Sequence, residues 1–256
     1  MNLWENTPGL CEKIPTLDYY PAKNKKSDAT VVIFPGGAYV GLATHEGQGY
    51  AEFLNDFGYD AFVCNYRVKP HAFPLPLLDA RRAVRTVRYN ADKYGINKSK
   101  IAVMGSSAGG NLAALASTCT LPLEYEGTDE IDSENFLPNA QILCYPVITL
   151  VDKNVMHEGS MLNLLADRLD LAPALSPELN VTKSTPPAFI WHTAEDSGVS
   201  VLNSYMYASA LKKQDVPVEM HIFPFGGHGM GAAVGNPNVS QWTGLLDNWL
   251  DLIFGK

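Results

Sequence analysis

The sequence lacks several features that would direct it to a particular class of protein. Its few cysteines show no CxxC spacing of the kind found in zinc or redox sites. No run approaches eighteen consecutive apolar residues, so no membrane-spanning helix is predicted. The opening MNLWENTPGLCEKIP has no basic start followed by an apolar stretch, which is the pattern of a secretory signal. We therefore expect a cytoplasmic protein whose thiols are reduced and buried, namely Cys11, Cys64, Cys119 and Cys144.

An excess of positive charge is also absent. The 256 residues include 27 Asp and Glu against 19 Lys and Arg, a formal net charge of −8. This balance provides no basic surface for nucleic acid and disfavours anionic membranes, so neither is an expected partner. A small molecule is the expected partner, and self-association into a homo-oligomer stays open. The apolar fraction of 46% and the charged fraction of 18% are typical of a globular chain with a substantial core.

Short β-rich runs alternate with longer helical patterns along the chain. Several of the short runs are apolar at consecutive positions, as in strands that helices cover on both faces. The expected strands are Thr30–Phe34, Ala61–Tyr66, Lys100–Gly105, Ala140–Tyr145, Ala188–Thr193 and Val218–Pro224. The expected helices are Glu46–Phe57, Asp79–Tyr94, Gly109–Ser117, Ser200–Gln214 and Gln241–Phe254. This alternation predicts an α/β fold with a doubly wound, mainly parallel sheet and helices on both faces.

Two irregular stretches interrupt the alternation. Residues 122–138 are acidic and rich in turn-forming residues, so we expect a surface excursion there. Residues 149–187 follow one expected strand and precede the next, with a candidate short helix at Ser160–Leu169. A segment of under about forty residues is too short to form a domain of its own. We therefore expect a single domain over residues 1–256, with a small cap-like insertion around 149–187.

The helix expected at Asp79–Tyr94 carries a row of arginines. Apolar residues at helical spacing form one stripe, and Arg81, Arg85 and Arg88 fall on another face. A phosphate site is one interpretation of these arginines, but a solvated helix face is the one that we favour. Asp79 stands at the start of the helix, where we expect it to be the N-cap.

The most specific motif is GSSAG at residues 105–109, between the strand-like KIAVM and the helical NLAALAS. A Gly-x-Ser-x-Gly sequence at a strand-to-helix junction is typical of a nucleophile elbow. The glycines leave room for a very tight turn, and the serine hydroxyl then stands over a helix N-terminus that favours negative charge. The motif predicts Ser107 as a nucleophile. Ser106 is in the wrong register, because its flanking positions would be Met104 and Ala108 instead of glycines.

A serine is a poor nucleophile unless a base takes its proton. His228 lies in a glycine-rich loop after the last expected strand, and strand C-termini are where ligands meet an open α/β sheet. We therefore expect His228 to be the base, with His192 as the alternative. The imidazole in turn needs a carboxylate, which Asp196 or Glu195 can supply. Asp196 is favoured, and the order serine, aspartate, histidine is that of the α/β hydrolases.

Attack on a carbonyl also needs N–H donors for the oxyanion that forms. The first expected strand ends in PGGAY at residues 35–39, where α/β hydrolases place half of their oxyanion hole. Glycines at such a position let a substrate approach the backbone closely. We expect the donors to be the backbone N–H groups of Gly37 and Ala38, together with that of Ala108 after the nucleophile.

Together these motifs resemble the α/β-hydrolase esterases, from about Thr30 to the C-terminus. Within that superfamily the chain is similar to acetyl xylan esterases and other small carbohydrate esterases. Hormone-sensitive-lipase-like relatives carry HGGG where this chain has PGGA, so Ala38 replaces the third glycine. The alanine keeps the backbone N–H donor, and its methyl group is expected to narrow the substrate pocket. The segments that carry the resemblance are PGGAY at 35–39, EG at 46–47, DARRAVR at 79–85, GSSAGG at 105–110, WHTAED at 191–196 and GGHG at 226–229.

The resemblance implies an α/β-hydrolase fold with a minimal cap and a serine carboxylic ester hydrolase that works through an acyl-enzyme. Short acyl esters are the expected substrates, above all acetyl groups on sugars or oligosaccharides, because a small insertion cannot bury a long acyl chain. Tyr39, His45 and Trp191 are expected at the rim as sugar contacts. No metal or other cofactor is expected. The alternatives are a peptidase or amidase, a general lipase-like esterase, and a non-catalytic binding protein of the same fold.

Overall fold

A computed structural model describes residues 1–9, 14–123, 125 and 129–255 of the chain. Its strands are β1 (Thr16–Tyr20), β2 (Thr30–Phe34), β3 (Asp60–Asn65), β4 (Ile101–Ser106), β5 (Ala140–Cys144), β6 (Ala188–Thr193) and β7 (Val218–Phe223). Its α-helices are α1 (Thr44–Asp56), α2 (Leu75–Tyr89), α3 (Ala91–Tyr94), α4 (Ala108–Thr118), α5 (Glu158–Leu165), α6 (Leu202–Lys213) and α7 (Gln241–Phe254). Three short 3₁₀ helices are η1 (Glu130–Ser133), η2 (Leu169–Leu171) and η3 (Pro177–Leu179).

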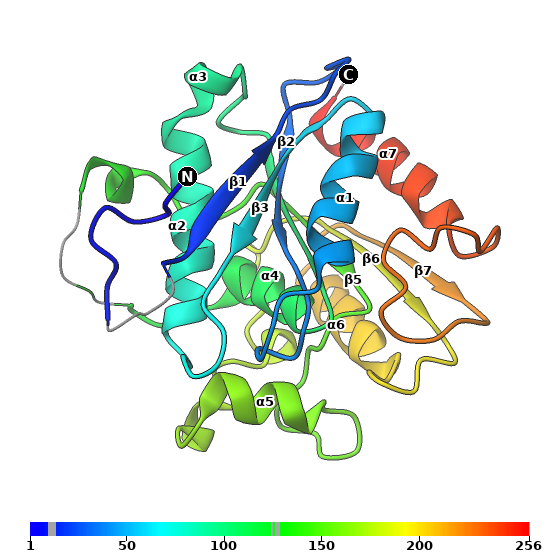
Figure 1. Ribbon diagram of the computed structural model, residues 1–256. Helices are drawn as coiled ribbons and strands as arrows, with labels where there is room; N and C mark the ends of the chain where they lie inside the picture. The colour runs from blue at the N-terminus through cyan, green and yellow to red at the C-terminus, as the bar shows by residue number, and fades with distance from the viewer. Residues whose placement is uncertain (10–13, 124, 126–128, 256) are drawn as a thin grey trace.

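The seven strands form one sheet in the order β1-β3-β2-β4-β5-β6-β7, and only β1 runs antiparallel to its neighbour. Successive strand residues point to opposite faces, so the sheet separates two cores. Val31 and Ile33 pack in one core with α1 and α7, whereas Val32 and Phe34 pack in the other with α2, α4 and α6. In Figure 1, α1 and α7 stand to the right of the sheet and α2 to its left. The predicted doubly wound, mainly parallel sheet is confirmed.

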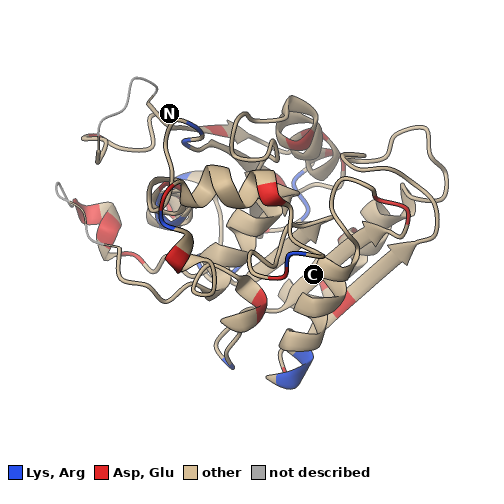
Figure 2. Cartoon of the chain, turned by 90° about the horizontal axis from the view of Figure 1, so that it is seen from below, with Lys and Arg blue, Asp and Glu red and all other residues tan. Residues whose placement is uncertain are grey.

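Charged residues are spread along many elements in the view from below (Figure 2). None of the helices within the described residues is long and apolar enough to cross a membrane. Cys64, Cys119 and Cys144 are buried and free, as expected, whereas Cys11 lies outside the described residues.

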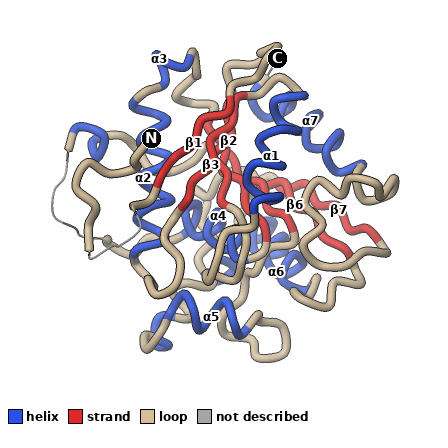
Figure 3. The backbone as a smooth tube through the Cα atoms, viewed as in Figure 1, coloured by secondary structure: helices blue, strands red, loops and turns tan. Residues whose placement is uncertain are grey.

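The strand β1 was not predicted from the sequence. This strand lies at one edge of the sheet beside β3 (Figure 3). Of its five residues only Leu17 is buried, and the Asn65 amide of β3 donates to Asp18 at 2.7 Å and to Thr16 at 2.8 Å. A short edge strand with mostly polar pairing has no continuous apolar run, so it gives little signal in a sequence.

The insertion at residues 149–187 contains α5, η2 and η3. Its helix α5 begins two residues before the expected Ser160 and ends at Leu165 instead of Leu169. In Figure 1, α5 lies along the lower edge of the molecule, outside the helices that flank the sheet. Asn163 of α5 donates its side-chain amide to the carbonyl of Ala38 at 2.9 Å. The insertion therefore contacts the loop that follows β2.

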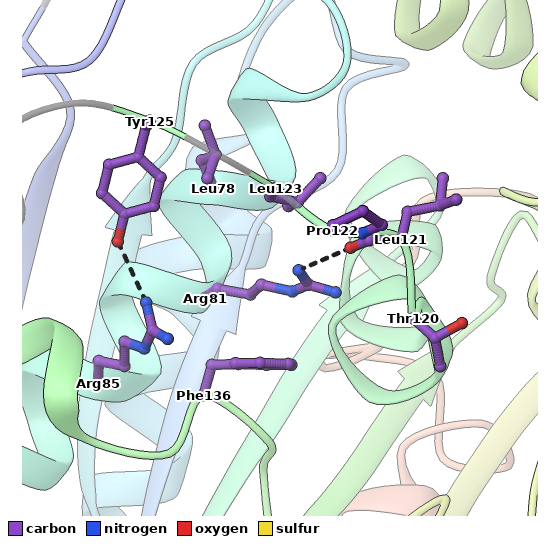
Figure 4. Close-up of a pocket in the computed structure, with 9 residues that line it drawn as sticks. All are labelled: Leu78, Arg81, Arg85, Thr120, Leu121, Pro122, Leu123, Tyr125 and Phe136. Carbon is purple, nitrogen blue, oxygen red and sulfur yellow. Dashed lines mark hydrogen bonds between the residues drawn. The ribbon is translucent and has the colours of Figure 1, made fainter.

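The arginines of α2 do not form a solvated face, and that prediction is wrong. Arg81 and Arg88 are buried and donate to main-chain carbonyls of the neighbouring loops. The Arg81 guanidinium lies 4.2 Å from the centre of the Phe136 ring, and Arg85 donates to the Tyr125 hydroxyl (Figure 4). Guanidinium groups have several donors, so they can satisfy the carbonyls of an irregular segment that packs over them.

Asp79 is not an N-cap, because α2 begins four residues earlier, at Leu75. The side chain of Asp79 is fully buried, and both of its oxygens accept hydrogen bonds. Arg67 donates to them from its backbone N–H at 2.9 Å and from Nε and Nη2 at 2.8 and 2.7 Å, and the Trp4 indole donates at 2.8 Å. This buried ion pair ties the chain after β3 and the N-terminal segment to α2.

We expect Asp79→Ala to lower the free energy of unfolding by about 3–5 kcal/mol, because it leaves the Arg67 guanidinium buried without a counter-charge. The matched control is Asp92→Ala in α3, where the side chain is exposed; it should change stability by less than about 1 kcal/mol. Urea unfolding followed by circular dichroism measures both values. Equal effects of the two substitutions would contradict the importance of the buried pair.

Candidate active site

A single residue, Ser107, joins β4 to α4, and its backbone has φ 53° and ψ −119°. Side-chain-bearing residues rarely adopt this conformation. A Cβ atom on Gly105 would lie 2.0 Å from the carbonyl oxygen of Gly109, and one on Gly109 would lie 2.0 Å from that of Phe34. Both glycines are therefore needed for the tight turn, which presents the Ser107 side chain at the C-terminal edge of the sheet.

Side chains from three strand ends meet at this turn. His228 Nε2 lies 2.9 Å from Ser107 Oγ, and His228 Nδ1 lies 2.7 Å from Asp196 Oδ2. The carboxylate is fully buried, whereas 29% of the His228 side chain is exposed. A Cβ atom on Gly198 would lie 2.9 Å from the imidazole, so a glycine there lets the ring pack closely. The line of contacts has the geometry required for an imidazole to take the serine proton.

Asp196 is held by four donors. Oδ2 contacts His228 and, at 3.2 Å, His192 Nε2, while Oδ1 accepts the backbone N–H groups of Gly198 and Val199 at 2.8 and 2.9 Å. Burial by itself raises the pKa of Asp196, but the hydrogen bonds from the two histidines and from Val199 outweigh it and hold that pKa below its ordinary value. The carboxylate therefore stays ionised beside the imidazole.

The two alternatives considered for these positions lie differently. Glu195 is exposed, and the carboxylate that faces His228 is that of Asp196. His192 is fully buried, with Nδ1 2.8 Å from Ser204 Oγ and Nε2 shared between Asp196 and the carbonyl of Val199. Both ring nitrogens are thus engaged inside the protein, and neither is free to take a proton from the serine.

In the loop after β2, beside the serine turn, the N–H groups of Gly37 and Ala38 are left without a partner in the described residues. The carbonyl of Gly36 accepts from Ala43 N–H at 2.9 Å, and that of Gly37 accepts from two N–H groups of the same loop. Because C=O and N–H point in opposite directions across a trans peptide, these bonds turn the N–H groups of Gly37 and Ala38 away from the loop. Within the described part of the chain, neither these N–H groups nor that of Ala108 has a hydrogen-bond acceptor.

Of the side chains expected at the substrate rim, only His45 is exposed. Trp191 is fully buried in the core beneath α1 and α7, and its ring stacks on Trp242 with centroids 4.9 Å apart. Tyr39 is 1% exposed and donates its hydroxyl to Asn111 at 2.8 Å. The prediction of sugar contacts by the side chains of Trp191 and Tyr39 is therefore wrong, because neither has surface to offer.

Two buried residues near the site had been given no role from the sequence. Glu46 accepts the N–H of Gly36 on one carboxylate oxygen at 2.8 Å and the Tyr145 hydroxyl on the other at 2.7 Å. The same hydroxyl accepts the N–H of Gly231 at 2.9 Å. Glu46 lies in a segment that carries the resemblance to the esterases, which is a weak signal for it. A tyrosine at the end of a strand is ordinary, so no pattern in the sequence points to Tyr145.

Comparison with known proteins identifies the family of this chain. Residues 17–211 match the BD-FAE family, which is more than half of the chain. This chain belongs to the BD-FAE family. The match ends before β7 and the loop that carries His228.

The chain is 34% identical to endo-1,4-beta-xylanase B of Butyrivibrio fibrisolvens, over 95% of this chain and 39% of that protein. It is also 34% identical to an acetylxylan esterase of Xylanibacter ruminicola, over 89% of this chain and 46% of that protein. The BD-FAE chain thus spans less than half the length of these two relatives.

Among solved structures, the acetyl ester-xyloside bifunctional hydrolase of Caldicellulosiruptor lactoaceticus is 41% identical, with a TM-score of 0.93 over 100% of this chain and 96% of that one. The fold of this BD-FAE protein is therefore that of the α/β-hydrolase esterases, and the resemblance inferred from its motifs is confirmed. Within the described residues, no three His, Cys, Asp or Glu side chains are grouped so that they could hold a metal ion.

The lowered pKa of Asp196 predicts how stability depends on pH. A carboxyl with a lower pKa in the folded than in the unfolded state stabilises the fold above its unfolded pKa of about 4. That contribution is lost as the pH falls toward the folded value. We expect Asp196→Asn to lower the free energy of unfolding by about 1–3 kcal/mol at neutral pH, and this difference to shrink below about pH 4.

Urea unfolding of the wild type and of Asp196→Asn at several pH values measures this difference. Glu195→Gln is the matched control, because it removes the charge of the exposed neighbour, and it should give a small, pH-independent change. A deficit of Asp196→Asn that stays constant from neutral to acidic pH would contradict the assignment.

Proposed function

We propose that this BD-FAE protein is a serine carboxylic ester hydrolase with Ser107 as nucleophile, His228 as general base and Asp196 as the acid that orients it. The observation that carries the proposal is the continuous line of contacts from Ser107 Oγ through both nitrogens of His228 to Asp196 Oδ2, at 2.9 and 2.7 Å. The family supports ester chemistry, since several relatives and solved neighbours are named esterases.

The proposed reaction has two halves. Ser107 Oγ attacks the ester carbonyl carbon while His228 Nε2 takes the hydroxyl proton, and the N–H groups of Gly37, Ala38 and Ala108 stabilise the oxyanion. The tetrahedral intermediate collapses, the C–O bond to the alcohol breaks, and the alcohol leaves with the proton from His228. Water then attacks the acyl-enzyme while His228 takes a proton from it. The bond between the acyl carbon and Ser107 Oγ breaks, Ser107 takes the proton from His228, and the acid is released.

Asp196 contributes throughout this cycle without exchanging a proton. It accepts from His228 Nδ1, so Nε2 is the nitrogen that faces the serine. Its negative charge stabilises the imidazolium that exists after each proton transfer. A carboxylate whose pKa is held low by several donors remains ionised for this purpose.

We further propose that the substrates are short acyl esters, with acetyl groups on sugars or oligosaccharides as the natural class. The names of an acetylxylan esterase and of an acetyl ester-xyloside hydrolase among the similar proteins support this choice. The insertion at 149–187 supplies one short α-helix near the loop after β2, which is little apolar cover for a long chain.

We expect Ser107→Ala to abolish turnover of an acetyl ester, with a loss on the order of 10⁶-fold in kcat and an unchanged fold. A fluorophosphonate should add its mass to Ser107, which fragmentation of the labelled peptide distinguishes from Ser106. Ser117→Ala is the matched control, since this buried serine of α4 donates its hydroxyl to the carbonyl of Ala113 in its own helix. Near-parental turnover by Ser107→Ala would refute the nucleophile.

We expect catalytic efficiency to fall from acetyl to butyryl to octanoyl esters of one alcohol, by about tenfold or more overall. Acetylated xylo-oligosaccharides should in turn be better substrates than a simple acetate. Steady-state kinetics with a pH-stat measures each ester on the same scale. A preference for octanoyl would refute the short-acyl claim. Cleavage of simple esters without release of acetate from any sugar would leave a general esterase, and faster cleavage of matched amides would indicate an amidase.

A further inference from the structure

Tyr145, which immediately follows β5, has a strained backbone. Seven non-glycine residues of the described chain have positive φ, and four of them lie at the proposed site: Ala38, Tyr39, Ser107 and Tyr145. At Tyr145 φ is 37°, in the left-handed region that bulky residues avoid. Such a conformation costs about 1–3 kcal/mol and persists only where the surroundings hold it. The proposed reaction uses Ser107 and Ala38, and Tyr39 follows Ala38 in the loop after β2, but Tyr145 has no role in that reaction.

The Tyr145 hydroxyl joins two loops of the site. It donates to Glu46, whose other oxygen accepts the N–H of Gly36. Gly36 lies at the start of the loop after β2, here called the oxyanion loop because it supplies the proposed oxyanion donors Gly37 and Ala38. The Tyr145 hydroxyl also accepts the N–H of Gly231, three residues after His228 in the loop that carries the base. One buried phenol therefore connects the segment that supplies the oxyanion donors to the segment that supplies the imidazole.

The nucleophile turn is attached to the same phenol. The Tyr50 hydroxyl lies 3.1 Å from that of Tyr145 and 2.7 Å from the hydroxyl of Ser106, the residue before the nucleophile. The Tyr145 ring also packs edge-on against His228 and Trp191, with centroids 5.1 and 4.9 Å apart. Three of the segments that carry the proposed chemistry thus meet at Tyr145, namely the loop after β2, the nucleophile turn and the loop that carries His228.

The directions of the hydrogen bonds that join Tyr145 to Glu46 and to Gly231 are fixed. Burial raises the pKa of Tyr145 well above its ordinary value, and the neighbouring Glu46 raises it further, so the phenol keeps its proton. The phenol can therefore donate to Glu46, while the backbone N–H of Gly231 can only donate to the phenol. A phenylalanine at this position would leave the N–H and one carboxylate oxygen without their partner.

We propose that Tyr145 is a positioning residue that sets the distance between the oxyanion donors and His228. Its hydroxyl acts through Glu46 and Gly231 and, within the described residues, makes no hydrogen bond to Ser107 or His228. The inference rests on the proposed function of the site. Oxyanion donors stabilise the transition state only when they lie at hydrogen-bond distance from the developing charge, and a displacement of about 1 Å costs about 100-fold in rate. Ground-state binding depends less on this distance, so the effect falls on kcat.

The test is Tyr145→Phe, which keeps the ring and removes only the hydroxyl. We expect kcat for an acetyl ester to fall by about 10- to 100-fold, while KM changes by less than about threefold. The matched control is Tyr207→Phe. Tyr207 is another buried tyrosine, whose hydroxyl donates to Gln141 at 2.9 Å between α6 and β5. The control should lose comparable stability and keep its kcat.

Glu46→Gln and the double variant complete the design. If Tyr145 and Glu46 act as one unit, Glu46→Gln lowers kcat similarly, and the double variant loses no more than about threefold beyond either single variant. The proposal is overturned if Tyr145→Phe keeps kcat within about twofold, if Tyr207→Phe loses as much, or if the single losses multiply in the double variant. A wild-type protein without ester hydrolysis would instead overturn the proposed function, and this role with it.

Discussion

The arrangement of the site depends on a close approach between Gly109 and the carbonyl oxygen of Phe34. A Cβ atom on Gly109 would lie only 2.0 Å from that oxygen. Without a side chain at Gly109, the start of α4 packs directly against the end of β2. The loop after β2 then lies beside the N-terminus of α4. The proposed oxyanion donors come from these two segments, and within the described residues their N–H groups have no acceptor. A larger residue at Gly109 would push the start of α4 away from the end of β2 and so separate the two sets of proposed donors.

Features that depend on neighbouring residues were predictable from the sequence. The six parallel strands, the serine turn and the histidine loop each have a local pattern of apolar residues or glycines, and each expected strand lies within one residue of its observed bounds. The contacts that hold the site together are not local. Glu46 and Tyr145 are 99 positions apart, and Tyr145 and Gly231 are 86 apart. Pairs so far apart leave no periodic pattern in the sequence, so the buried network of Glu46, Tyr145 and Gly231 could not be predicted from it.

The wrong predictions for the arginines of α2 and for Trp191 both concern which face of an element is covered by other parts of the chain. An amphipathic stripe shows which face of α2 enters the main core, but it does not show that an irregular segment covers the opposite face and gives Arg81 and Arg88 carbonyl partners. The position of Trp191 near the end of a strand suggested that it lies at the substrate rim. The alternation of side chains between the two faces of β6 places it in the core instead. Phe189 and Trp191 point into the core of α1 and α7, and Ile190 points into the other. The two-residue period of the strand was the better guide.

The insertion at 149–187 also contacts the loop after β2. Asn163 donates to the carbonyl of Ala38, one residue along from the peptide group whose N–H is a proposed oxyanion donor. Ala38 and Tyr39 both have positive φ, so this turn needs external contacts to stay in place. Glu46 holds the same loop at its start, through Gly36. The loop after β2 is therefore held at two points, at Gly36 by the buried polar network and at Ala38 by the insertion. The proposed cover over the substrate thus also holds the loop that supplies the proposed oxyanion donors.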